Sequence, residues 1–178
     1  MLRIFKPTYL LNKVTDIKPA RLKELGIKAI LADVDNTLVA WHDPYGSPEI
    51  LEWIRDIYAS GLEIILVSNN TTKRVAKVSE QLGVDGVAWS LKPLPRGVNK
   101  ALKRLGAKGV TKKEVIMIGD QMLTDILSAN LLGVDTVLVR QLVASDLAIT
   151  RINRIFERKI VGHFTKKHPE DFIWKDSL

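Results

Sequence analysis

Short apolar runs that end in polar residues recur along this chain, and they constrain its fold more than any other feature. The five runs are Lys28–Asp33, Glu63–Asn69, Gly86–Ser90, Glu114–Asp120 and Asp135–Arg140. Nearly continuous apolar runs of this length are typical of strands whose two faces are both buried. The sequence therefore predicts five buried strands.

Helical patterns fill most of the gaps between these runs. The predicted helices are Pro48–Tyr58, Thr72–Leu82, Pro95–Leu105 and Leu123–Leu132, and a glycine follows closely after each of them. Strands that alternate with helices indicate an α/β fold, here a three-layer, doubly wound, Rossmann-like parallel sheet. At 178 residues the chain is long enough for one such domain.

Four of the predicted strands end in polar side chains that could share one site. These are Asp33, Ser68, the segment Ser90–Lys92, and Asp120. In a doubly wound sheet, ligands bind beyond the carboxyl ends of the strands, where the strand order reverses. A strand-end aspartate can also simply cap a turn. This interpretation fits a single aspartate better than it fits several polar strand ends together.

Asp33 is paired with a second aspartate, Asp35. In an extended chain their side chains point the same way, about 6.6 Å apart along the strand, so both can address one ligand. An EF-hand calcium loop starting at Asp33 is excluded, because its sixth position is Leu38 instead of glycine and its twelfth is Pro44 instead of glutamate.

Four short motifs occur in a fixed order: DVDNT at 33–37, SN at 68–69, KP at 92–93 and GDQMLTD at 119–125. In this order they resemble the haloacid dehalogenase (HAD) superfamily of phosphatases, and more narrowly its capless, YqeG-like members of subfamily IIIA. Those members are similar to the mitochondrial phosphatidylglycerophosphatases. The resemblance implies a single HAD-like domain over residues 1–178, with a motif-bearing core at about 28–140, a basic segment at 1–27 and a helical extension at 141–178.

The resemblance also implies a role for each motif residue. Asp33 is the implied nucleophile, which forms an aspartyl-phosphate. Asp35 would protonate the leaving group and later activate water, and Lys92 would neutralise the phosphoryl group. The implied substrate-binding residues are Thr37, Ser68 and Asn69, with Thr37 also helping to hold the loop or Asp35.

A Mg²⁺ site is implied at the same place, formed by Asp33, the backbone carbonyl of Asp35, and Asp120, with Asp125 in support. Electrostatics independently favours a cation there. Two like charges 4 Å apart cost about 4 kcal/mol at an effective dielectric constant of 20, and Lys92 alone cannot balance up to four carboxylates.

The function that follows is Mg²⁺-dependent phosphomonoester hydrolysis through an aspartyl-phosphate. Only 32 residues separate Asp35 from Ser68, which leaves no room for a cap domain. Within the superfamily, an uncapped site suggests a large or lipid-linked substrate such as phosphatidylglycerophosphate, or an oligomer in which a neighbour closes the site. The alternative substrates for the same chemistry are nucleic-acid ends and small metabolites. Two alternatives belong to other classes: a non-catalytic phosphate- or RNA-binding adaptor, and a receiver-like phospho-acceptor domain. The receiver-like domain fits less well, because its acceptor aspartate would follow a middle strand, whereas here the acidic pair follows the first predicted strand.

Basic residues are concentrated at the two ends of the chain. Residues 1–29 hold 7 Lys or Arg against 2 Asp or Glu, residues 140–178 hold 8 against 5, and the middle holds 12 against 13. Two interpretations stay open. The ends contact an anionic partner, a membrane surface being favoured over nucleic acid, or they only keep the protein soluble.

The stretch after Gln141 is predicted to form an amphipathic helix to about Ile160. Such a helix either packs on the sheet or presents its apolar face to a membrane or a partner.

Two compositional absences indicate the cellular setting. The chain has no cysteine, which excludes disulfides and thiolate metal ligands. No stretch approaches the ~20 apolar residues of a membrane-spanning helix, and Lys6, Pro7 and Lys13 interrupt the first residues where a signal peptide would be apolar. We therefore expect a cytoplasmic protein, either free in the cytoplasm or in peripheral contact with a membrane.

Overall fold

The structure is a computed structural model that describes residues 2–143, 161–162, 166 and 173–178. The amphipathic helix predicted from Gln141 to about Ile160 lies almost entirely outside the described residues. Its role therefore stays a prediction.

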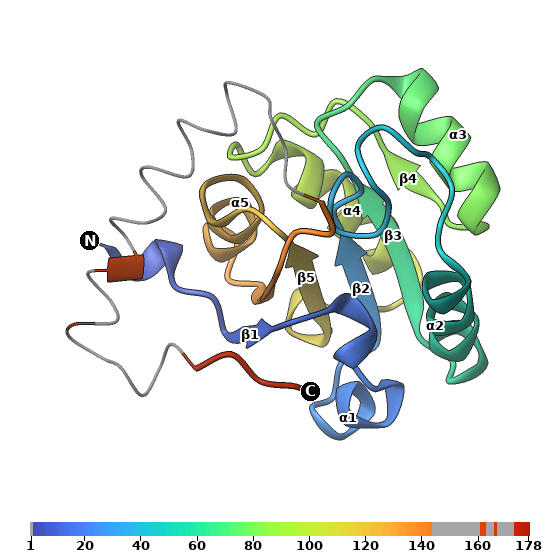
Figure 1. The fold of residues 1–178 in the computed structure, drawn as a ribbon. Coiled ribbons are helices and arrows are strands. Elements are labelled where there is room, and N and C mark those ends of the chain that lie inside the picture. Colours follow the sequence, from blue (N-terminus) through green and yellow to red (C-terminus); the bar gives the residue numbers. More distant parts are fainter. Residues whose placement is uncertain (1, 144–160, 163–165, 167–172) are drawn as a thin grey trace.

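The core of the fold is a six-stranded, fully parallel sheet with the order β1-β6-β5-β2-β3-β4 (Figure 1). The strands are β1 (Tyr9–Leu11), β2 (Ala29–Ala32), β3 (Glu63–Val67), β4 (Gly86–Val87), β5 (Val115–Gly119) and β6 (Asp135–Val139). The strand order reverses between β2 and β5, because β3 and β4 extend the sheet on one side of β2 while β5 and β6 extend it on the other. Ligand sites of doubly wound sheets lie at this kind of reversal.

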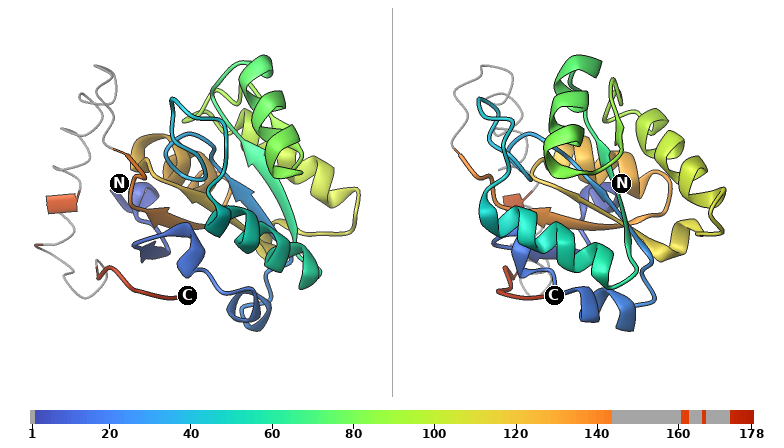
Figure 2. Two further views of the ribbon diagram at one scale, coloured as in Figure 1. Left: turned by 45° about the vertical axis from the view of Figure 1, so that its right-hand side comes forward. Right: turned by 90° about the vertical axis from the view of Figure 1, so that its right-hand side faces the viewer.

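Helices cover both faces of the sheet (Figure 2). On one face, α1 (Pro19–Glu24), α2 (Pro48–Ala59) and α3 (Thr72–Leu82) contribute to the same buried apolar cluster as Ile30 and Ala32 from β2. On the other face, α4 (Arg96–Gly106) and α5 (Leu127–Asn130) share a cluster with Ala29 and Leu31 of the same strand. Since successive side chains of a strand point to opposite faces, a strand covered on both sides must be apolar throughout. The predicted three-layer α/β fold is confirmed.

Short turns complete the described elements. They are 3₁₀ turns at Leu2–Phe5, Val14–Asp16 and Lys112–Glu114, and a π-helical turn at Met122–Ile126. The sequence predicts a continuous helix at Leu123–Leu132, but the structure has the π-helical turn followed by α5. Single π-helical turns are frequent at functional sites, and this one carries Asp125, whose carboxylate accepts a bond from the backbone N–H of Gln121 at 3.0 Å.

Two elements that were not predicted from the sequence, β1 and α1, precede the first predicted strand. Strand β1 is three residues long and pairs with β6, more than a hundred residues away along the chain. Lys175 adds to its outer side by donating its N–H to Leu10 O at 2.9 Å, so both ends of the chain meet at this edge of the sheet. The acidic pair therefore follows the second strand along the chain, which lies in the middle of the sheet.

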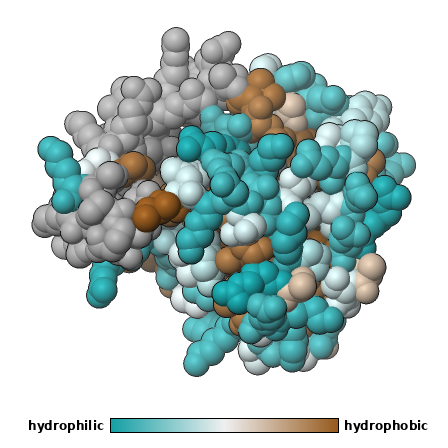
Figure 3. Space-filling view, turned by 60° about the horizontal axis from the view of Figure 1, so that its bottom comes forward, coloured by the Kyte–Doolittle hydropathy of each residue, from teal (hydrophilic) through white to brown (hydrophobic). Residues whose placement is uncertain are grey.

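The surface at the amino ends of the strands, near α1, carries mostly hydrophilic side chains (Figure 3). Its apolar side chains form separate small patches. Among the described residues, no helix is both long enough and apolar enough to cross a membrane.

Glycine allows α4 to approach the loop that follows β4. A Cβ atom at Gly97, near the start of α4, would overlap the Cβ and Cα atoms of Ser90, whereas a Cβ at Gly106, at the other end of the same helix, would meet nothing within 4 Å. Gly97 therefore fixes the distance between α4 and the segment that leads to Lys92.

We predict that Gly97→Ala destabilises the protein while Gly106→Ala does not. Overpacking against the Ser90 backbone should cost about 1–3 kcal/mol, which lowers the melting temperature by about 2–4 °C per kcal/mol in a chain of this size. Gly106→Ala should be neutral or stabilise by up to about 1 kcal/mol, because alanine favours helix more than glycine does. Thermal unfolding followed by circular dichroism compares the two variants, and equal melting temperatures would contradict the close approach.

Candidate active site

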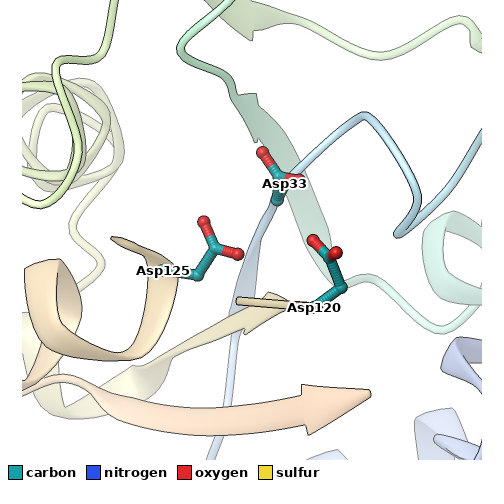
Figure 4. A group of neighbouring side chains, drawn as sticks. All are labelled: Asp33, Asp120 and Asp125. Carbon is teal, nitrogen blue, oxygen red and sulfur yellow. The ribbon is translucent and has the colours of Figure 1, made fainter. Parts of the chain in front are cut away.

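Strands β2, β3 and β5 end at the same level of the sheet, and the residues that follow them form the site. Ala32 of β2 pairs with Leu66 of β3 and with Ile118 of β5, so Asp33, Ser68 and Asp120 follow at one edge of the sheet. Asp125 reaches the same place from the π-helical turn. The carboxylates of Asp33, Asp120 and Asp125 face one common space (Figure 4).

These three carboxylates are buried and close together. Each contributes an oxygen that lies within 4.8 Å of the others, and all three residues are less than one tenth exposed. Burial, followed by repulsion from Asp125 and Asp33, raises the pKa of Asp120 well above its usual range. Burial also raises the pKa of Asp125 to about 6, although the nearby Lys92 opposes this rise.

Lys92 is the cation within this cluster. Its ammonium nitrogen lies 2.6 Å from Asp33 Oδ1 and 2.7 Å from Asp125 Oδ1, and it donates to the carbonyl oxygen of Val67 at 2.6 Å. Burial alone would lower the pKa of Lys92, but the carboxylates of Asp125 and Asp33 outweigh burial and raise it above its usual value. Lys92 is therefore held in its charged form, with three oxygen atoms within 2.7 Å of its ammonium nitrogen.

Lys92 balances the charge of only one carboxylate when all three are ionised. The other side-chain contacts that the described residues make to the cluster are neutral: the Thr37 hydroxyl lies 3.4 Å from Asp33 Oδ2 and 3.3 Å from Asp120 Oδ1, and Gln141 Nε2 donates to Asp120 Oδ2 at 2.7 Å. Carboxylate oxygens that are buried and face each other are the ligands that hard divalent cations such as Mg²⁺ prefer. The residues present therefore fit a divalent metal ion.

Asp35 contacts different partners from Asp33. Arg74 Nη2 lies 2.9 Å from Asp35 Oδ1, and Asn70 Nδ2 donates to Asp35 Oδ2 at 3.2 Å. The backbone turns soon after the strand ends, with Asn36 at a φ of 65°. The side chain of Asp35 thus binds α3 and the turn before it, and it stays outside the carboxylate cluster. Asp33, Asp35 and Asp125 nevertheless line one cavity, the active-site cavity.

Arg74 is a site residue that the sequence analysis missed. Besides Asp35 it binds the carbonyl oxygens of Ala40 at 3.0 Å and Asp43 at 3.2 Å, so it ties the loop after β2 to α3. One signal was available in the sequence. Arg74 lies in the first turn of a helix capped by Thr71, where the helix dipole disfavours a cation. A nearby anion offsets this effect.

The three residues expected to bind substrate lie in different environments. Ser68 lines the cavity, and its hydroxyl accepts the N–H of Asn70 at 3.1 Å, which leaves the hydroxyl proton for another acceptor. Asn69 also lines the cavity, but its side chain holds the loop after β4: it accepts from Ser90 Oγ and Lys92 N, both at 2.7 Å, and donates to Lys92 O at 2.8 Å.

Thr37 lies beside the carboxylates and away from the cavity wall. It is almost fully buried, contacts Asp33 and Asp120, and is not among the residues that line this cavity. These contacts tie Thr37 to the two carboxylates, and its expected roles in binding substrate and in holding the loop or Asp35 stay predictions.

The cavity above the cluster is much larger than a phosphate group. Its volume is about 880 Å³. Asp33, Lys92 and Asp125 line its polar part, and Trp41 and Trp89 line its outer part, where they are 46% and 59% exposed. The site can therefore accept a phosphate whose substituent extends along aromatic side chains.

Comparison with known proteins places this geometry in a family. The family model of haloacid dehalogenase-like hydrolases matches residues 17–133. Over 165 residues the chain is 37% identical to a protein of Bacillus subtilis (strain 168) named "Probable phosphatase YqeG", and the match covers 93% of this chain and 94% of that protein. Every motif residue discussed above lies within the range matched by the family model.

Solved structures share the fold. An uncharacterized protein from Listeria monocytogenes serotype 4b superposes with a TM-score of 0.53 and 19% identity, over 68% of this chain and 85% of that chain. A hypothetical protein from Xanthomonas campestris superposes with a TM-score of 0.50 and 16% identity, over 68% of this chain and 67% of that chain.

We predict that Mg²⁺ raises the melting temperature of the protein and that Asp120→Asn abolishes this rise. A ligand at a hundred times its dissociation constant stabilises the folded state by about 2.7 kcal/mol, and this corresponds to several degrees in a chain of this size. Without Mg²⁺ the variant should be at least as stable as the parent protein, because it loses carboxylate repulsion. The measurement is thermal unfolding with and without MgCl₂.

The control is Asp56→Asn, which removes an exposed carboxylate on α2. This variant should keep the full rise with Mg²⁺. A rise of unchanged size in Asp120→Asn would show that the ion binds elsewhere.

Proposed function

The chain belongs to the haloacid dehalogenase-like hydrolases, and from this premise we propose that it is a Mg²⁺-dependent phosphomonoester hydrolase that works through an aspartyl-phosphate on Asp33. The observation that supports this most is the position of Lys92 between Asp33 and Asp125, beside Asp120, at the polar end of a wide cavity. A carboxylate that lies at the polar end of an open cavity, beside a fixed cation, is placed to act as a nucleophile.

In the first step of the proposed reaction, an oxygen of Asp33 bonds to phosphorus and the bond from phosphorus to the ester oxygen breaks. Lys92 offsets the negative charge of both the incoming phosphoryl group and Asp33. The Ser68 hydroxyl and the backbone N–H groups at the start of α3 would bind phosphate oxygens, since a helix N-terminus favours anions. Thr71 caps this helix, accepting the N–H of Arg74 at 3.3 Å.

Asp35 would transfer protons in both steps. As an acid it protonates the departing ester oxygen. As a base it then takes a proton from the water that attacks phosphorus, and the bond between phosphorus and the Asp33 oxygen breaks, which restores Asp33. Arg74 and Asn70 each bind one oxygen of the Asp35 carboxyl group and so fix its direction.

Asp33, Asp120 and the backbone carbonyl of Asp35 would hold the Mg²⁺ ion. When bound, the ion supplies neutralisation of the charge on the transferred phosphoryl group. Asp125 would act indirectly, because its oxygens contact Lys92 and the backbone N–H of Gln121. A binding-only adaptor is disfavoured by this arrangement, since assembling buried like charges costs free energy that simple phosphate binding does not require.

For the substrate we propose a phosphomonoester with a large leaving group, of which phosphatidylglycerophosphate is the candidate favoured by the sequence resemblance. Two observations support a large leaving group: the 880 Å³ volume of the cavity, and the exposed indole rings of Trp41 and Trp89 along it. The basic residues at the chain ends suit an anionic membrane surface, where each contributes about 1 kcal/mol to binding.

We predict that Asp33→Asn abolishes hydrolysis of an aryl phosphate in the presence of Mg²⁺. Loss of the nucleophile should lower kcat by roughly 10³-fold or more, because the remaining groups cannot form the covalent bond. The measurement is release of the aryl alcohol, with circular dichroism to check the fold. Asp85→Asn, which changes an exposed carboxylate before β4, is the matched control and should keep full activity.

The intermediate itself can be tested by mass spectrometry of acid-quenched protein. Asp35→Asn should accumulate one phosphoryl group on the peptide that contains Asp33, since the water of the second step lacks its base. Full activity in Asp33→Asn would refute the covalent mechanism.

We predict that phosphatidylglycerophosphate in anionic vesicles is hydrolysed with a kcat/KM roughly tenfold or more above that of the aryl phosphate. The physical reason is the additional contact of the leaving group with the cavity walls. Phosphate release is measured from both substrates under identical conditions, with a small phosphorylated sugar and a 5′-phosphorylated oligonucleotide included. A higher kcat/KM for the sugar or for the oligonucleotide would replace the lipid assignment.

A further inference from the structure

A second cavity adjoins the active-site cavity. It has a volume of about 520 Å³ and lies along the edge strand β4, between α3 and α4. We call it the basic groove and define it by Trp89, Leu91, Arg96, Lys100 and Arg104. The role proposed for Lys92 and the other motif residues does not use these side chains.

The charge of the basic groove has one sign. Among the described residues that line it, three are cations and none is Asp or Glu. Arg96, Lys100 and Arg104 follow each other at intervals of four residues on α4, so they lie along one side of the helix, each about 6 Å from the next. Arg104 donates to the carbonyl oxygen of Gly86 at 3.2 Å, whereas Arg96 and Lys100 make no ion pair with the described residues. Arg104 also borders a separate cavity that contains Glu63 and Asp85. Arg96 and Lys100, which have no Asp or Glu beside them in the groove lining, therefore favour an anionic ligand most strongly.

The groove and the active-site cavity meet at Trp89, which lines both of them. They also adjoin at the start of α3, where Thr71 lines the active-site cavity and Thr72 lines the groove. Trp89 precedes Lys92 by three residues in the loop that Asn69 holds. A molecule bound at Lys92 can therefore extend past the Trp89 ring into the groove.

The loop holds its apolar side chains outward. Trp89 and Leu91 are 59% and 48% exposed, and both have left-handed backbone conformations, with φ angles of 50° and 57°. Bulky residues rarely adopt this conformation, and residues that do so are concentrated at binding sites. Their exposure beside the cations gives the groove an apolar part and an anion-binding part.

We propose that the basic groove binds a second anionic group on the leaving-group side of the substrate, while Trp89 contacts the portion between the two anions. The inference rests on the proposed function and narrows its substrate class to phosphomonoesters that carry a further phosphate or phosphodiester. A free bisphosphate and a phospholipid headgroup share this chemistry. A second copy of the chain fits the groove less well, because a twofold contact would bring the two rows of cations together.

The test compares alkanediol bisphosphates with alkyl monophosphates of the same chain length. We expect kcat/KM for the bisphosphate, divided by two for its two equivalent phosphates, to exceed that for the monophosphate by roughly tenfold at low ionic strength, mainly through KM. Lys100→Glu should bring the ratio of the two kcat/KM values near one. Lys103→Glu, which makes the same change at an exposed position of α4 outside the groove lining, should leave the ratio unchanged.

A second arm identifies the source of the anion. It compares phosphatidylglycerophosphate with phosphatidic acid, which lacks the phosphodiester beside its monoester, in vesicles of the same neutral lipid. A preference for the bisphosphate in solution supports the proposal and assigns a free bisphosphate as the source of the second anion. A preference for phosphatidylglycerophosphate in vesicles supports it and assigns the lipid headgroup as the source.

Three outcomes would overturn the proposal. Equal kcat/KM values for singly and doubly anionic compounds in both arms would refute the role of the groove while leaving the phosphatase function intact. Equal effects of Lys100→Glu and Lys103→Glu on the ratio would do the same. Failure of the unchanged protein to hydrolyse any of these esters would refute the proposed function, and the inference with it.

Discussion

The buried contact of Lys92 with Asp33 and Asp125 is the interaction on which the rest of the site depends. A lysine in an apolar environment tends to lose its proton, and a carboxylate there tends to gain one. Placed within 2.7 Å of Lys92, the carboxylates hold Lys92 in its charged form, and Lys92 opposes the rise that burial causes in the pKa of Asp125. Removing one partner from such a buried group typically costs about 3–5 kcal/mol, because the other is left uncompensated. The positions of Lys92 and the carboxylates are therefore coupled.

Much of the surrounding backbone serves to bring these groups together. Level strand ends place Asp33 and Asp120 side by side, and a Cβ at Gly119 would overlap the carboxylate of Asp125. On the opposite side, Gly97 admits Ser90 against α4, and the side chain of Asn69 binds both Ser90 and Lys92. Without these close approaches, a lysine on a loop after an edge strand could not reach the middle of the sheet.

The charged groups and the residues that limit substrate size lie in different parts of the site. Lys92 and the carboxylates that would hold the metal ion are buried, whereas the aromatic residues Trp41 and Trp89 are exposed and leave the cavity wide. In the described residues, the connection from β2 to β3 consists of a loop and α2, with no additional domain above the site. Selection among phosphomonoesters must then come from the walls of the cavity and from the basic groove beside it. Because Trp41, Trp89 and the basic groove lie outside the four motifs, the family resemblance does not specify them.

The sequence by itself determined the central strands, the helices between them and the set of polar residues at the strand ends. It could do so because a parallel strand covered on both faces must be continuously apolar, and a polar residue at its end is then conspicuous. Only the tertiary structure decided the partners of those residues. Asp35 binds Arg74, the Thr37 hydroxyl contacts Asp120, and Gln141 binds Asp120. These contacts, like the pairing of β1 with β6, join segments far apart in the chain. Neither hydrophobic periodicity nor residue type indicates which distant segment will lie opposite a given residue.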